Sequence, residues 1–189
     1  MGTSVRIFLV AVLILSCTVS AYAQEELWKE LNNKAFTFYQ QGRYSEAANI
    51  VEEALTFAEK TFGPNHPHVA TSLNNLALLY QAQGKYSEAE SLHKRALGIR
   101  EKAFGKDHAH VAASLNNLAE LYRVQGKYVE AEPFYKRALG IVEKALGPEH
   151  PHVAITLENM AELYKKIGKE DEAERLEERA REIRSKSGN

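Results

Sequence analysis

The chain has 189 residues, of which 44% are hydrophobic and 26% are charged, and its formal net charge at pH 7 is −1. This composition is typical of a folded globular protein and excludes an intrinsically disordered chain. The basic residues are dispersed among acidic ones, with no basic stripe that carries stacking aromatic residues, so we expect no nucleic-acid binding.

The first 23 residues differ in character from the rest. Arg6 is followed by an unbroken apolar run over 7–15, and Ala21-Tyr22-Ala23 places small residues at the two positions that a signal peptidase reads. The apolar run is short for a membrane span, which needs about 20 residues. The segment is therefore predicted to be a secretory signal peptide, cleaved after Ala23, and no membrane span is expected once it is removed.

A second route of export stays open. Residues 14–17 read ILSC, which loosely resembles a bacterial lipoprotein box whose cysteine becomes a lipidated N-terminus. Cleavage after Ala23 would instead remove the only cysteine and leave a mature protein without thiol or disulfide chemistry. We expect a secreted or periplasmic protein, with lipid anchoring through Cys17 as the alternative.

From residue 24 onward one unit of 42 residues occurs four times. Residues 63–104 and 105–146 are identical at 29 of 42 positions, and glycine returns in step at Gly42, Gly84, Gly126 and Gly168. Such a fixed period indicates a repeat architecture. We place the repeats at about 24–62, 66–104, 108–146 and 150–187, in one domain over 24–187, and a short tail at 188–189.

Each repeat reads as two helices. Within 73–83 the apolar residues recur at i, i+3, i+4 and i+7, and 86–104 carries a second stripe of the same kind. Gly84 and Gly105 are placed to end these helices, since glycine tolerates the left-handed conformation found after helix C-termini. With no strand pattern in the chain, the prediction is all-α, with about eight antiparallel helices.

The repeated motifs are LNNLAxLY, then GKYxEAE, then KRAL, and then GxxHxHVA. Together they resemble the tetratricopeptide repeat (TPR), in the 42-residue form found in kinesin light chains. The resemblance runs from about residue 26 to 184. It implies a right-handed superhelical solenoid of four helix-turn-helix repeats, in which the first helices line an inner groove that binds peptides or partner helices.

The paired histidines of the last motif leave two interpretations. Each pair lies at i and i+2, and equivalent histidines are a whole repeat apart, so the three or four ligands of a zinc site would not meet around one ion. The favoured interpretation is structural, at the start of the next helix, where Pro67 and Pro151 also suit the first turn. Metal binding is the alternative.

The resemblance places the groove on the inner columns of the first helices. Adjacent asparagines occur there at 74–75 and 116–117, although asparagine costs a helix about 0.5 kcal/mol relative to alanine. Their amides could grip a peptide backbone, or one of each pair could bond a neighbouring helix; Asn75 and Asn117 are favoured for the partner. The candidate partner-binding residues are Asn74, Asn75, Asn116, Asn117, Asn159, Glu120, Arg123, Glu162 and Lys165.

Catalysis and cofactors are not expected. No nucleophile elbow, P-loop, dinucleotide fingerprint or HExxH motif occurs, and Ser72 and Ser114 recur near histidines as part of the repeat. Together with the predicted signal peptide, the resemblance implies an exported scaffold for protein–protein interaction, with a protein or peptide partner and no small-molecule substrate.

The alternative function is a self-associating structural protein of the cell envelope. The first helix keeps an apolar face of Leu27, Trp28, Leu31 and Phe36 that could pack against another copy, whereas the charged last helix argues against stacking at that end. Gly98 and Gly140 lie inside second helices, where glycine costs about 1 kcal/mol, and nothing in the sequence explains them.

Overall fold

A computed structural model describes the backbone of residues 2–187 and the side chains of residues 21–187. The expected tail at 188–189 and the side chains of Arg6 and Cys17 lie outside the described residues. The described part contains no strand and eight helices: α1 (Gly2–Gln40), α2 (Tyr44–Phe62), α3 (Pro67–Ala82), α4 (Tyr86–Phe104), α5 (Ala109–Val124), α6 (Tyr128–Leu146), α7 (Pro151–Lys166) and α8 (Glu170–Ser187).

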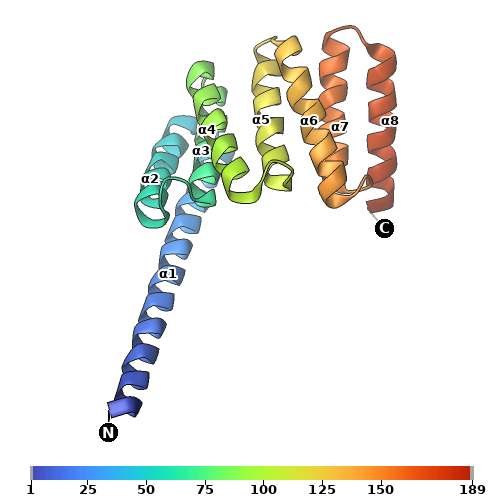
Figure 1. Cartoon of the computed structure of the whole chain (residues 1–189). Coiled ribbons are helices and arrows are strands. Elements are labelled where there is room, and N and C mark those ends of the chain that lie inside the picture. Colours follow the sequence, from blue (N-terminus) through green and yellow to red (C-terminus); the bar gives the residue numbers. More distant parts are fainter. Residues whose placement is uncertain (1, 188–189) are drawn as a thin grey trace.

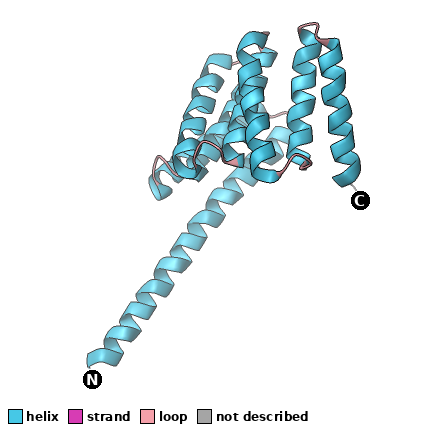
Figure 2. Ribbon diagram, turned by 45° about the vertical axis from the view of Figure 1, so that its right-hand side comes forward, coloured by secondary structure: helices cyan, strands magenta, loops and turns pink. Residues whose placement is uncertain are grey.

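The helices pack as a solenoid. Each helix contacts the next one along the chain, and the first helices of consecutive repeats also touch, α3 with α5 and α5 with α7. Antiparallel pairs therefore follow one another from α1–α2 to α7–α8 (Figures 1 and 2). The predicted all-α repeat fold is confirmed.

Helix α1 continues without a break through Ala23. Its N-terminal part projects away from the other helices, and only its C-terminal part packs against α2 and α3 (Figure 1). Among the described residues, no helix is both long enough and apolar enough to cross a membrane. Cleavage after Ala23 thus stays a prediction.

Small side chains allow the two helices of each pair to pack closely. The alanines that recur in the second helices are fully buried, and Leu73, Leu115 and Leu157 occupy equivalent buried positions on the first helices. An alanine at a crossing lets two helix backbones approach, so the same interior can be rebuilt in each repeat. The buried alanines are Ala47, Ala54, Ala89, Ala96, Ala131, Ala138, Ala173 and Ala180.

The repeated histidines begin the first helices. His66, His108 and His150 are the N-cap residues of α3, α5 and α7, and each Nδ1 accepts a hydrogen bond from the backbone N–H two residues later, at 3.1–3.2 Å. This satisfies one of the backbone donors that every helix leaves free at its N-terminus. The first histidine of each pair is a helix cap, as the structural interpretation held. Among the described residues no three His, Cys, Asp or Glu side chains come together as metal ligands could.

Glycine ends the first helices by the predicted means. Gly84 has φ +76°, and Lys85 N–H returns to the carbonyl of Tyr80 at 2.9 Å. This is the hydrogen-bond pattern of a Schellman motif, in which a residue other than glycine would be strained. The tight reversal aims α4 back along α3.

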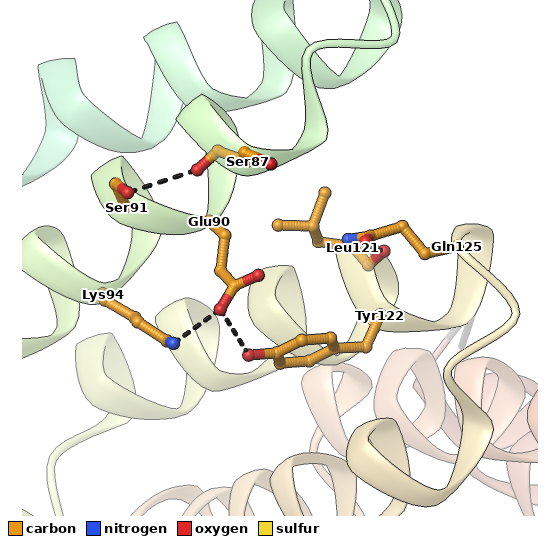
Figure 3. A network of polar contacts seen from close by, with 7 residues as sticks. All are labelled: Ser87, Glu90, Ser91, Lys94, Leu121, Tyr122 and Gln125. Carbon is orange, nitrogen blue, oxygen red and sulfur yellow. Dashed lines mark hydrogen bonds and ion pairs between the residues drawn. The ribbon is translucent and has the colours of Figure 1, made fainter.

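Tyrosine hydroxyls tie each repeat to the one before it. The hydroxyl of Tyr122 on α5 donates to Glu90 on α4 at 2.9 Å, and the ammonium of Lys94 binds the same carboxylate (Figure 3). The equivalent bond joins Tyr164 to Glu132 at 3.1 Å, and Tyr80 bonds Glu52, one helical turn further along α2, at 2.7 Å. These bonds add to the apolar packing that joins consecutive helix pairs.

Candidate functional site: the inner face of the first helices

The largest gathering of the predicted site residues is a hollow between α5 and α7. Its volume is about 430 Å³, and Val142 of α6 also reaches it. Six of the nine candidates line it: Asn116, Asn117, Glu120, Arg123, Asn159 and Glu162; the remaining lining residues are Ala109, Ala113, His152 and Ile155. The structure therefore brings the C-terminal half of the predicted set to one place.

The side-chain amides of Asn117 and Asn159, which line this hollow, are left unused by the fold. They occupy equivalent positions in consecutive repeats, and both are half-buried. Neither side-chain amide makes a hydrogen bond within residues 21–187, whereas most polar side chains around them do. Each amide can offer one acceptor and two donor hydrogens to a ligand.

The charged groups of the hollow are largely satisfied by one another. Arg123 donates from Nε and Nη2 to the two oxygens of Glu120, both at 2.7 Å, and its Nη2 lies 3.3 Å from Glu162. The hydroxyl of Tyr135 on α6 also donates to Glu120, at 3.0 Å. The bond to Glu120 raises the pKa of Arg123 above its usual range, and burial raises the pKa of Tyr135. Arg123 is thus a fixed cation between two carboxylates, and Glu162 is the more exposed of the two.

A second hollow of about 270 Å³ lies where α1 and α3 meet, and it is mainly apolar. Asn75 lines it, but its amide already donates to Asn32 on α1 at 2.9 Å. The residues around it are Ala35, Phe36, Tyr39, Val51, Asn75, Leu78 and Leu79. Asn75 therefore lies at the predicted surface, but part of its hydrogen-bonding capacity is already used by Asn32.

Asn74 requires a correction. Its side chain is 4% exposed, its amide nitrogen donates to Ser114 at 3.2 Å, and its oxygen lies 2.8 Å from Nδ1 of buried His93. Asn74 thus serves the packing of one repeat on the next and offers nothing to a partner. Asn116, at the equivalent position, lines the larger hollow while its nitrogen donates to Thr156 at 2.9 Å.

Lys165 is also placed differently from the expectation. It does not line the hollow, and its ammonium forms an ion pair with Glu177 of α8. Glu158, at the position equivalent to Asn74, pairs with Arg184 of α8 through two bonds of 2.6 Å. Of the two basic candidates, Arg123 lines the hollow and Lys165 does not.

Sequence reasoning missed several apolar residues of the two hollows. Phe36, expected from the sequence as part of an apolar face for another copy, is 58% exposed and lines the smaller hollow, while Ile155 is 42% exposed and lines the larger one. The signal was available, because Phe36 stands 42 residues before Leu78 and 126 before Glu162, in a column already assigned to the groove. Trp28, grouped with Phe36, is instead buried and donates to Ser72 at 3.0 Å.

Comparison with known proteins gives the same architecture. The crystal structure of BtubC (BKLC) from P. vanneervenii is similar, with a TM-score of 0.76 and 28% identity over 88% of this chain and 66% of that chain. A crystal structure from Podosopora anserina, described as a kinesin light chain with nearly identical TPR-like repeats, has a TM-score of 0.72 and 29% identity over 84% of this chain and 75% of that one. No curated protein matches the chain significantly.

A third structure shows the fold alone. Aspartyl phosphate phosphatase F from Bacillus subtilis has a TM-score of 0.75 but only 17% identity, over 87% of this chain and 42% of that chain. The chain spans just under two thirds of the length of BtubC.

The family model of the tetratricopeptide repeat matches residues 30–102, 73–139 and 110–186, which together cover the solenoid. Proteins of this family generally mediate protein–protein interaction. With this match and with neighbours of the kinesin-light-chain type, the chain belongs to the tetratricopeptide repeat family.

Proposed function

We propose that this protein is an exported interaction module that binds an extended segment of a protein partner in the hollow between α5 and α7. The proposal rests on one observation: Asn117 and Asn159 line the same hollow, and their side chains make no hydrogen bond within residues 21–187. Asparagine in a helix interior costs about 0.5 kcal/mol relative to alanine. Two such residues at equivalent positions, without a structural partner, are explained by a ligand.

The chemistry of these amides suits a peptide backbone. An extended segment presents alternating N–H and C=O groups, and a carboxamide can pair with one of each. Repeats that present the same amide at regular intervals can therefore hold a backbone without reading its sequence. Ile155 and Ala113 supply apolar contact beside the amides, so that bonds formed in the hollow are partly shielded from water.

Export is the second part of the proposal. The apolar run over 7–15 and the Ala21-Tyr22-Ala23 end support removal of residues 1–23, after which α1 would begin near Gln24. Trp28 and Ala35, which pack into the solenoid, lie beyond that point. Cleavage would therefore leave the packed part of α1 in place. Lipid anchoring through Cys17 is the alternative route to the same side of a membrane.

End-to-end self-association is the less favoured function. The last helix, α8, carries Arg181 where Leu55, Leu97 and Leu139 pack against neighbouring repeats. Arg181 is exposed, as are Glu174, Glu178 and Glu182 around it. A first helix of another copy would have to bury these charges, which is costly without matched partners.

The test first selects peptide ligands and then measures whether they bind in the hollow between α5 and α7. Peptides of random sequence displayed on phage are selected on the full chain, and the affinity of the selected peptides is measured by titration calorimetry. The variant combines Asn117→Ala and Asn159→Ala. The matched control is Asn49→Ala, which replaces an exposed helical asparagine of α2 that lines neither inner hollow.

We expect the double variant to weaken binding about tenfold or more, which corresponds to about 1.4 kcal/mol for the loss of two hydrogen-bonding side chains. The control should bind within about twofold of the parent protein. Selected peptides that bind the double variant as tightly as the parent would contradict the proposal. So would a chain that yields no peptides and forms concentration-dependent oligomers in light scattering.

A further inference from the structure

The inner face changes its chemistry between α3 and α5 while its geometry repeats. Positions 42 residues apart carry Phe36 on α1 and Leu78 on α3, and then Glu120 on α5 and Glu162 on α7. The neighbouring column begins with Tyr39 and passes through Gln81 to Arg123 and Lys165. Because all four repeats build the same helix pair, the fold does not demand this change. The amide column, with Asn75, Asn117 and Asn159, stays constant beside it.

The α1–α3 end of the inner face is apolar and exposed. Phe36, Tyr39 and Leu78 are 58%, 44% and 40% exposed, and they surround the smaller hollow. Isolated apolar residues on a surface are ordinary, but three large ones around one depression mark a contact surface. The rings of Phe36 and Tyr39 lie 6.5 Å apart and nearly parallel, which leaves room for an inserted apolar side chain beside them rather than between them.

The α5–α7 end carries an excess negative charge. The charged residues that line the larger hollow are Glu120, Glu162 and Arg123, which sum to −1. Glu120 is engaged by Arg123 and Tyr135, so the excess falls on Glu162, whose side chain is 60% exposed. Lys165 is held by Glu177, and Lys166, one turn after Glu162, forms no ion pair with it among the described residues. A cation at the hollow would find one accessible carboxylate.

We infer that the segment bound in this groove carries a large apolar side chain at one end, against Phe36 and Leu78, and a lysine or arginine at the other, against Glu162. This inference rests on the proposed function and adds the chemistry of the ligand. The two hollows are two repeats apart, and packed helices lie about 8–10 Å from one another, so the span is about 20 Å. An extended chain rises about 3.3 Å per residue, so the two side chains are about six residues apart.

The test uses synthetic peptides of about ten residues, a length that covers this span. The probe begins with Phe-Leu, continues with serine and threonine, and ends with Lys-Lys; its reverse is also made, because the groove can be entered in either direction. A charge-swapped probe ends with Glu-Glu, and an apolar-deleted probe begins with Ser-Ser. Each carries a fluorophore, and affinity for the full chain is measured by fluorescence anisotropy.

The protein variants are Glu162→Lys and Phe36→Ser. Each has a matched control outside the groove: Glu174→Lys on an exposed position of α8, and Val129→Ser at a residue of α6 that is 85% exposed. We expect the lysine probe to bind the parent protein about tenfold more tightly than the charge-swapped probe, and Glu162→Lys to reverse that order. Phe36→Ser should weaken the lysine probe about fivefold and leave the apolar-deleted probe unchanged. Both controls should stay within about twofold of the parent.

Equal affinity for the lysine and glutamate probes, or a Glu162→Lys variant that changes both alike, would overturn the inference. It also falls if neither probe binds while library-selected peptides do. In each of these cases the groove function stands as long as binding is lost with Asn117→Ala and Asn159→Ala. If no peptide of either kind is sensitive to the two asparagines, the proposed function itself fails.

Discussion

The side-chain nitrogen of Asn74 on α3 donates a hydrogen bond of 3.2 Å to the hydroxyl of Ser114 on α5, which is fully buried. The next repeat has the same relationship, in which Asn116 donates to Thr156 at 2.9 Å. In the first repeat the indole N–H of Trp28 donates a hydrogen bond to the corresponding hydroxyl, that of Ser72. Asn74 and Asn116 thus join consecutive first helices, whereas Asn117 faces the groove without such a bond and Asn75 faces it while bonded to Asn32 on α1.

This division predicts a difference in stability between two identical substitutions. Asn74→Ala removes the partners of His93 and Ser114 in a buried place, so we expect the free energy of unfolding to fall by about 2 kcal/mol. Asn159→Ala breaks no bond within residues 21–187 and should leave stability unchanged or raise it by about 0.5 kcal/mol. Urea unfolding followed by circular dichroism measures both. Equal losses would mean that the two columns are not distinct.

Acid should destabilise the fold through the buried histidine of this network. Burial, with a smaller effect of nearby Arg100, lowers the pKa of His93 from 6.5 to about 4. Its folded-state pKa lies below the unfolded value, so the contribution to stability is present above about pH 6.5 and is lost as the pH falls toward 4. Burial also lowers the pKa values of His66, His68 and His110, which act in the same direction.

Between pH 7 and pH 5 we expect His93 alone to cost about 2 kcal/mol of unfolding free energy. The measurement is urea unfolding at the two pH values. The control is His93→Gln, which keeps an N–H donor for Asn74 and does not titrate. Its stability should fall less over the same interval. An equal fall in the variant would show that other groups set the acid response.

The histidine caps can be tested at an exposed position. His108 accepts from the backbone of His110 at 3.2 Å and stacks on Phe104 with ring centroids 4.7 Å apart. His108→Ala should lower the unfolding free energy by about 1 kcal/mol, because α5 loses its N-cap acceptor. His108→Asp should restore or exceed the parent stability, since a carboxylate caps well and suits the positive end of the helix dipole. If aspartate rescues nothing, the capping role is wrong.

Replacing Gly98 or Gly140, which the sequence left unexplained, with alanine should make the protein more stable. A Cβ atom added at Gly98 or Gly140 would meet nothing within 4 Å, and neither residue has positive φ. The equivalent positions of the first and last repeats carry Thr56 and Glu182, so the fold accepts side chains there. Gly98→Ala and Gly140→Ala should each stabilise by about 0.5–1 kcal/mol, measured by urea unfolding. Destabilisation would point to a close approach that the structure does not contain.

Processing of the N-terminus is open to direct measurement. Mass spectrometry of the protein exported by its source cells should give a chain that begins at Gln24, as the Ala21-Tyr22-Ala23 end predicts. A chain that begins with a lipid-modified Cys17 would establish the lipoprotein route. A chain that keeps residues 1–23 would contradict both.

The fold could be predicted from the sequence because the same pattern of residues occurs in four copies. Four copies of the same apolar stripes, with glycines such as Gly84 at the turns, leave little choice of secondary structure or connectivity. The helix caps were harder, because histidine is an uncommon N-cap and its role depends on an acceptor nitrogen that only the backbone geometry reveals.

The site was predicted in part, and its errors have physical causes. Asn74 and Asn75 are 100° apart around one helix, and the packing of α5 decides which of them is buried. One signal was present in the sequence: Glu158 replaces the asparagine in the repeat of α7, and its carboxylate pairs with Arg184 of α8. Lys165 was misplaced because a long side chain can reach several carboxylates, and the position of α8 makes Glu177 its partner.

Crosslinking in the source cells tests whether the hollow between α5 and α7 holds the partner. A benzoyl-phenylalanine is placed at Ile155, which lines the hollow, or at Val129, an exposed residue of α6 outside it. We expect a discrete crosslinked species from position 155 that is absent from position 129 and disappears when Asn117→Ala and Asn159→Ala are added. The same species from both positions, or one that persists without the two asparagines, would contradict it.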